Sequence, residues 1–246
     1  MDHYIGLFSA YAVVTALRFS IQHFQPEFIP TPKQLVIAKP GRELLYLLMT
    51  VAAIIGIGQL YTADLLIPAI PPWDGLTESL NQLLIFSPVF LFLYLCKPSP
   101  VSLFLVRENW FRRLTLGLIL AVVALFTFWL ATPAQIDLAT LFVEPLRPGN
   151  IDFPVQVFFE DLLIAMFLSR LSALTSVRKT VLLVAVAFAA AHIPAFLAGG
   201  DTPQELLSLI ADAALGAMVF GMILKTRDFL WIFPVHWVMD TTQFHF

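Results

Sequence analysis

The sequence predicts an all-α protein, a polytopic bundle of about eight transmembrane helices with an active site inside the membrane. Composition is the first reason: 59% of the 246 residues are hydrophobic and only 13% are charged. Mean hydropathy is +0.84, and soluble domains carry about twice this share of charge. The second reason is a series of long apolar runs. The third is a small set of ionisable residues placed within the later runs.

A helix that crosses a bilayer needs about 20 mostly apolar residues. The runs of that length cover roughly residues 4–22, 43–62, 80–96, 114–132, 154–171, 179–198, 204–224 and 229–246. Trp73, Trp110 and Trp231 stand near the ends of such runs, where tryptophan commonly anchors a helix at the interface. No internal repeat or separate soluble segment is visible, so residues 1–246 are expected to form a single membrane domain.

The basic residues orient the bundle. All but one of the 14 Lys and Arg residues flank alternate connections between the runs, and the exception is Arg147. Because cytoplasmic connections are enriched in basic residues, we expect both termini to lie outside the cytoplasm. The expected location is the prokaryotic inner membrane, with the lipid bilayer as a partner. Nucleic-acid binding is not expected, because the net charge is −3 and the basic residues are confined to short connections.

Three of the later runs carry ionisable residues. Glu160 and Asp161 lie in the fifth run, His192 in the sixth, and His236 and Asp240 in the last. A charged group at bilayer depth costs at least a few kcal/mol, so such groups commonly mark functional sites. In the predicted topology Glu160 lies ~9 Å and His192 ~10 Å from the same membrane face. The shared depth predicts that these side chains surround one cavity.

Each residue also has a structural interpretation. His236 and Asp240 are four residues apart and share a helix face, so Asp240 is expected to orient His236, or the two form a structural pair. Asp161 points about 100° away from Glu160 on a helix and is a supporting candidate. Asp212, within the seventh run, is expected to support a polar network.

The order of these motifs resembles the CPBP family of intramembrane proteases, which comprises type II CAAX prenyl endopeptidases and bacteriocin-processing or self-immunity proteins. The similarity begins with the acid pair Glu160-Asp161 and continues with F-x-x-x-H at Phe188 and His192. It ends with a glycine-containing helix, a turn, a Leu-Trp pair and H-x-x-x-D, at Gly216, Gly221, Thr226, Leu230, Trp231, His236 and Asp240.

The resemblance implies a division of the chain into catalytic core helices at 154–246 and accessory helices at 1–132. It also implies catalytic roles for Glu160, His192, His236 and Asp240. One position departs from the family pattern E-E-x-x-x-R, because Ala165 stands where the family has arginine. Arg170 lies more than one helical turn further along.

The same residues support peptide hydrolysis on chemical grounds, because this reaction needs an activated water and a group that stabilises the oxyanion. Glu160 is the expected general base, and His192 and His236 are expected to polarise the scissile carbonyl or hold the water. Two imidazoles with one or two carboxylates also form a normal catalytic site for Zn²⁺ or another divalent metal. A metal site at Glu160, His192, His236 and Asp240 and a metal-free mechanism both remain open at this stage.

The sequence therefore predicts an intramembrane endopeptidase that cleaves a membrane-associated peptide or protein, with a metalloendopeptidase as one form of it. A non-catalytic bacteriocin-immunity or scaffold protein would keep the bundle without a water site. A proton-coupled transporter would also place carboxylates and imidazoles in the membrane, but no inverted repeat supports transport. Finally, residues 133–153 are expected to form a short amphipathic helix at the interface that borders the substrate entrance.

Overall fold

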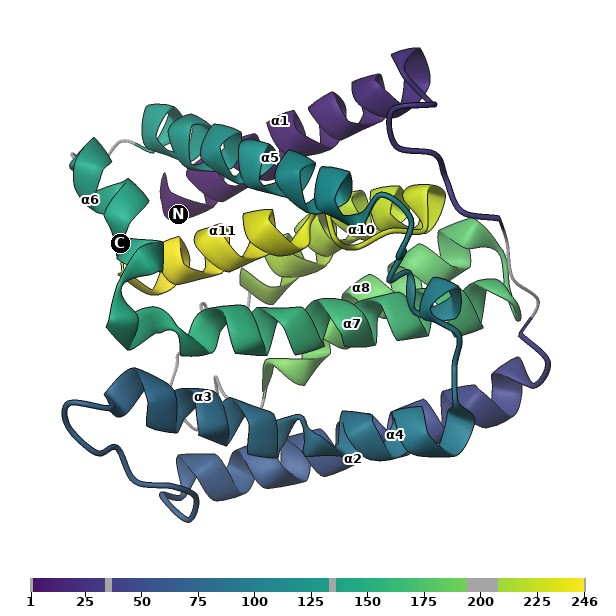
Figure 1. Ribbon diagram of the computed structural model, residues 1–246, viewed down its shortest axis with the longest axis horizontal. Helices are drawn as coiled ribbons and strands as arrows, with labels where there is room; N and C mark the ends of the chain where they lie inside the picture. Colours follow the sequence, from purple (N-terminus) through teal and green to yellow (C-terminus); the bar gives the residue numbers. More distant parts are fainter. Residues whose placement is uncertain (1, 34–36, 133–135, 194–207, 246) are drawn as a thin grey trace.

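The computed structural model describes residues 2–33, 37–132, 136–193 and 208–245, and within these ranges the chain forms helices and no β-strand (Figure 1). The all-α prediction is confirmed. The α-helices are α1 Asp2–Phe24, α2 Pro40–Thr62, α3 Asp74–Ile85, α4 Ser87–Cys96, α5 Trp110–Ala131, α6 Leu138–Val143, α7 Asp152–Ser172, α8 Val177–Ala191, α10 Ser208–Thr226 and α11 Phe233–His245. Three short 3₁₀ helices are η1 Pro100–Leu103, η2 Glu144–Leu146 and η3 Pro148–Asn150.

Each of the eight expected spans coincides with a helix or with the pair α3 and α4. Among the described residues α1, α2, α5 and α10 are long and apolar enough to cross a membrane. Helices α3 and α4 together make a fifth candidate, bent by 41°, where Pro88 in the first turn of α4 lacks a backbone N–H. The protein is thus an integral membrane protein. Residues 194–198 and 204–207, at the ends of the sixth and seventh expected spans, lie outside the described residues.

Three helices at expected span positions are shorter or more charged than a simple membrane span. α7 carries Glu160, Asp161 and Arg170. α8 has 15 residues and α11 has 13. At 1.5 Å per residue they measure about 22 Å and about 20 Å, against a hydrocarbon core of about 30 Å. These helices and the residue directly after α8 carry all the candidate site residues except Asp212, which lies in α10.

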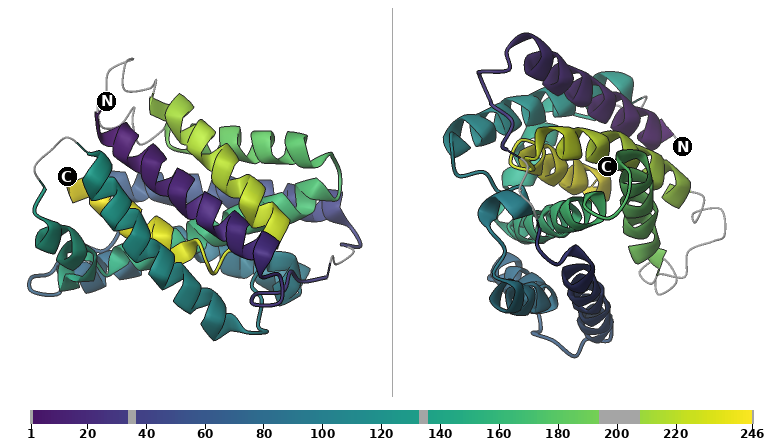
Figure 2. Two further views of the ribbon diagram at one scale, coloured as in Figure 1. Left: turned by 90° about the horizontal axis from the view of Figure 1, so that it is seen from above. Right: turned by 90° about the vertical axis from the view of Figure 1, so that its right-hand side faces the viewer.

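α7 lies between the group α2–α3–α4 and the pair α10 and α11 (Figure 1). It contacts α2, α3, α8, α10 and α11. Seen from above, α1 lies between α5 and α10 (Figure 2), and it packs against both. The helices that precede residue 132 therefore pack around the helices that carry the candidate site.

Two buried ion pairs fix distant segments to one another. Arg113 in α5 donates from Nη1 to Asp228 Oδ2 at 2.6 Å, and the two side chains are 1% and 0% exposed. Arg170 in α7 pairs with Glu43 in α2 at 3.0 Å and donates to the backbone carbonyl of Ser102 at 2.6 Å. These contacts hold α5, α7 and the turn after α10 in place.

Burial contradicts the expected interfacial role for one of the three tryptophans. Trp73 and Trp110 are 62% and 56% exposed, whereas Trp231 is fully buried. The prediction for Trp231 is wrong because its segment packs into the bundle. A Cβ atom at Gly117 in α5 would lie 2.8 Å from the carbonyl oxygen of Trp231, so glycine permits this close approach.

Candidate active site

A cavity of about 520 Å³ lies among α1, α7, α8, α10 and α11. All six candidate residues line it, although they come from four helical segments. These residues are Glu160, Asp161, His192, Asp212, His236 and Asp240. The predicted convergence of Glu160, His192 and His236 on one cavity is therefore confirmed.

α7 contributes the acid pair to the cavity wall. Glu160 is half-buried, and its Oε1 accepts a hydrogen bond of 2.9 Å from Nε2 of Gln156, one turn earlier. Asp161 is buried and points instead toward α11, where its Oδ1 lies 3.0 Å from Nδ1 of His236. Adjacent residues on a helix differ by about 100°, so the two carboxylates address different partners.

The partner of His236 differs from the one expected. Asp161, not Asp240, makes the hydrogen bond to its ring. The expectation failed because the i, i+4 spacing places two residues on one face without bringing their polar atoms together. Because an ionised carboxylate only accepts hydrogen bonds, Nδ1 of His236 carries the proton in this contact. Nε2 is then the ring atom left for the cavity.

His192 lies directly after the end of α8. Its Nδ1 lies 2.9 Å from the backbone carbonyl oxygen of Phe188, and the two rings meet edge to face at 4.8 Å. A carbonyl oxygen accepts and cannot donate, so Nδ1 is the protonated nitrogen. In a neutral imidazole the other nitrogen, Nε2, then carries a lone pair.

Asp240 and Asp212 complete the acidic wall. Asp240 stands one turn after His236 in α11, and Asp212 lies in α10. Within the described part of the chain, Oδ2 of Asp240 is buried without a hydrogen-bond partner, and so is Oδ2 of Asp161. Buried carboxylate oxygens without partners are costly, and both belong to side chains that line the cavity.

Three further residues of the cavity wall escaped the sequence analysis: Tyr11, Gln156 and Gln243. The glutamines carry no charge, so the search for ionisable groups passed over them. Tyr11 lies in α1, which was expected to be accessory. For Gln156 a signal was present, because it precedes Glu160 by four residues on the same helix face.

The two residues at the departure from the family pattern do not line the cavity. Ala165 is fully buried. Arg170 belongs to the ion pair with Glu43 described above. Arg170 therefore does not replace the arginine that the family pattern has at the position of Ala165, and it brings no positive charge to Glu160 or Asp161.

An apolar recess of about 470 Å³ adjoins the cavity. It lies among α2, α3, α7 and α8 and shares five wall residues with the cavity: Gln156, Glu160, Ile164, Phe188 and His192. The recess wall contributed by α2 includes Ile55 and Gly58. The polar cavity is thus continuous with an apolar space.

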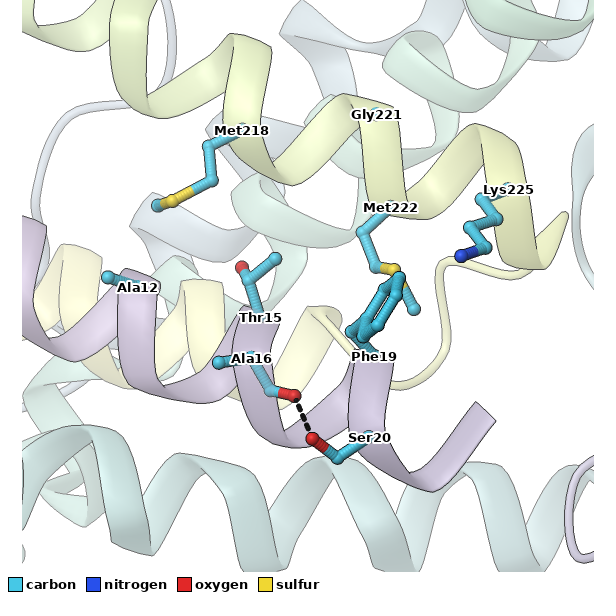
Figure 3. A pocket seen from close by; sticks show the side chains of 9 residues that line it. All are labelled: Ala12, Thr15, Ala16, Phe19, Ser20, Met218, Gly221, Met222 and Lys225. Atoms are coloured by element: carbon cyan, nitrogen blue, oxygen red, sulfur yellow. Dashed lines mark hydrogen bonds between the residues drawn. The ribbon is translucent and has the colours of Figure 1, made fainter. Parts of the chain in front are cut away.

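A separate groove of about 500 Å³ runs between α1 and α10 (Figure 3). Small residues, Ala12, Ala16 and Gly221, lie along it. At one end Nζ of Lys225 stands 4.0 Å from the centre of the Phe19 ring. None of the candidate site residues lines this groove.

The segment at 133–153, of which 133–135 lie outside the described residues, contains a short helix, as expected, but none of its described residues lines the cavity. Asp137 caps α6 by accepting from the N–H of Thr140, and hydrogen bonds from Thr140 hold the pKa of Asp137 below its usual value. Glu144 lies 3.6 Å from His245 at the end of α11. The segment packs against α11, so a role at the entrance gains no support from the cavity wall.

The carboxylates and imidazoles of the cavity are the types of side chain that bind Zn²⁺. Among the described residues no three His, Cys, Asp or Glu side chains are arranged to hold one ion. His236 and His192 each use Nδ1 for a hydrogen bond to the protein, which leaves Nε2 of each ring available, as in histidines that bind a metal. It is the spacing of the described side chains, as they lie, that does not form a three-ligand site.

Comparison with known proteins gives a match over the later part of the chain. Residues 150–242 match the family model described as type II CAAX prenyl endopeptidase Rce1-like. This match confirms the predicted resemblance to the CPBP family. No curated protein and no solved structure matches the chain.

Proposed function

We propose that Glu160 activates water to hydrolyse a peptide bond, because residues 150–242 match the family model described as type II CAAX prenyl endopeptidase Rce1-like, which implies a protease. The substrate is a membrane-associated peptide or protein. The observation that carries the proposal is the shared cavity, in which Glu160, His192 and His236 meet although they lie on separate segments.

In the proposed first step the Glu160 carboxylate takes a proton from a water molecule while the water oxygen attacks the scissile carbonyl carbon. His192 holds the water, because its Nε2 can accept the second water hydrogen when Nδ1 donates to Phe188. This step forms a tetrahedral intermediate with a negative charge on the former carbonyl oxygen. Glu160 then gives its proton to the leaving nitrogen as the C–N bond breaks.

His236 stabilises the oxyanion in this proposal. Its Nδ1 is held by Asp161 at 3.0 Å, so a doubly protonated ring directs Nε2–H to the cavity. The negative charge of Asp161 balances the positive imidazolium, and hydrogen bonds between charged groups are about twice as strong as neutral ones. Asp240, one turn away on the same helix, lies beside the developing negative charge and is proposed to hold a proton or a water there.

The proposed chemistry runs without a metal ion. Among the described residues the imidazoles and carboxylates are not arranged to hold one ion, and Glu160 and Asp161 hydrogen-bond to different partners. The protein side chains supply a base, a water acceptor and an oxyanion donor, which are the functions that hydrolysis requires.

The substrate reaches the cavity through the apolar recess. Its wall is made by α2, α3, α7 and α8 and joins the cavity at Glu160 and His192. An apolar chain in the recess would place an adjoining peptide bond next to Glu160. A lipid group on the substrate and an apolar peptide side chain would both fit this chemistry.

The test uses a pair of quenched fluorescent peptides, identical except for a prenyl group on the C-terminal cysteine, added to proteoliposomes that contain the protein. The expected result is cleavage by the wild type and loss of cleavage in Glu160→Gln. Glu27→Gln, which changes an exposed glutamate outside the site, should behave as the wild type. Unimpaired cleavage by Glu160→Gln would refute the proposal, and equal absence of product from all variants with both peptides would favour a non-catalytic immunity or scaffold protein.

A further inference from the structure

The polar cavity and the apolar recess meet at one stripe of α7. Gln156, Glu160 and Ile164 follow one another at intervals of four residues, and all three line both spaces. Residues at this spacing share a helix face. Gln156 is the polar neutral residue of the stripe, and it stands beside the proposed base.

The contact between Gln156 and Glu160 has a defined direction. Nε2 of Gln156 donates to Oε1 of Glu160 at 2.9 Å. A carboxylate cannot donate in return, so the amide must turn its NH₂ group to Glu160. With Oε1 engaged in this way, Oε2 is the carboxylate oxygen left to take a proton from water.

The charged groups around Glu160 distinguish this contact from an ordinary hydrogen bond between two side chains on a helix surface. Asp161 and Asp240 also line the cavity, so the Glu160 carboxylate stands among other acidic groups. The buried arginine of α7, Arg170, is occupied by Glu43 and Ser102. Among the described side chains, the hydrogen bond from Gln156 is the one given to the Glu160 carboxylate.

We infer that Gln156 is a positioning residue that fixes the orientation of the Glu160 carboxylate at the junction of the cavity and the recess. The inference rests on the proposed function, because it assigns a partner to the proposed base. Gln156 does not react itself. It holds one carboxylate oxygen so that the other faces the attacking water, and errors in such positioning are costly to the chemical step.

The principal variant is Gln156→Met, which keeps the length of the side chain and removes the donor. The expected result is a kcat lowered roughly tenfold with KM unchanged. Thr127→Val in α5 is the control, because it removes another side-chain hydrogen bond between residues four apart, the 2.8 Å contact to Val123. Thr127→Val should keep wild-type kcat, and both variants should show similar small changes in melting temperature in detergent.

A double-mutant cycle separates positioning from general stability. Glu160→Asp shortens the acid and withdraws it from Nε2 of Gln156. If Gln156 acts through Glu160, Gln156→Met should lower kcat much less in the Glu160→Asp background than in the wild type. Gln156→Glu is the second variant, because it replaces the donor with a like charge, and it should lower kcat further than Gln156→Met.

Wild-type kcat in Gln156→Met, or an equal loss in both backgrounds of the cycle, would overturn the inference. If Gln156→Met does not fold, the result for Gln156→Glu decides: full activity in that variant also overturns it. Loss of activity in Glu160→Gln with full activity in Gln156→Met would leave the proposed function standing and remove only the role of Gln156.

Discussion

Asp161 in α7 and His236 in α11 are joined by a hydrogen bond of 3.0 Å between Oδ1 and Nδ1. The residues are separated by 75 positions in the sequence, and their side chains are 3% and 17% exposed. The bond fixes which nitrogen of the imidazole faces the cavity. It therefore connects the packing of two helices to the protonation of a candidate catalytic group.

The first prediction concerns this pair. Asp161→Asn removes the negative charge that balances the His236 imidazolium, so the ring becomes neutral and no longer presents a charged Nε2–H donor to the oxyanion. We expect kcat to fall by about 10² or more, with KM little changed. Asp152→Asn, at the start of the same helix and outside the cavity wall, is the control. Retention of more than half of the wild-type kcat in Asp161→Asn would contradict the proposed role of the pair.

The second prediction tests the recess as the substrate path. A side chain at Gly58 meets no atom within 4 Å of its Cβ, and Gly58 lines the recess. Gly58→Phe should therefore fold normally, fill part of the recess and raise KM about tenfold at similar kcat. Gly56 also has open space around a Cβ but does not line the recess. If Gly58→Phe and Gly56→Phe give the same kinetics, the substrate enters elsewhere.

The third prediction concerns stability. Asp228→Asn would leave the Arg113 guanidinium buried without its counter-ion, because both side chains are almost fully inaccessible. The free energy of unfolding should fall by about 3–5 kcal/mol, measured by reversible denaturation in detergent. Asp64→Asn makes the same chemical change at an exposed turn with a φ of 57°, where asparagine is well tolerated. Equal stability of Asp228→Asn and Asp64→Asn would show that the buried pair contributes little.

Local patterns were sufficient to predict much of the fold. Apolar runs located the helices, because the length and polarity of a span follow directly from the bilayer. The same reasoning brought Glu160, His192 and His236 to one depth, since depth depends only on the count of residues from a helix end. The short helix before α7 was also visible in the sequence.

Rotations and tilts of the helices were not predictable in this way. Asp161 appeared to point away from the site, because only its angle to Glu160 on the helix was known. In the structure α11 lies on that side of α7, so Asp161 faces His236. Tyr11 joins the cavity because α1 packs against α10, which is a tertiary contact with no local signal. Trp231 looked like an interfacial anchor by its position, yet it is buried where α5 and the segment before α11 come together.

The central claim is that Glu160, without a metal ion, activates the water that cleaves the substrate. The most direct measurement compares cleavage of the quenched peptides by wild type and Glu160→Gln before and after treatment with a strong chelator, with bound metals quantified by mass spectrometry. We predict unchanged wild-type turnover after the metals are removed and no turnover by Glu160→Gln in either state. Loss of wild-type turnover on chelation with recovery on addition of Zn²⁺, or persistent cleavage by Glu160→Gln, would contradict the account.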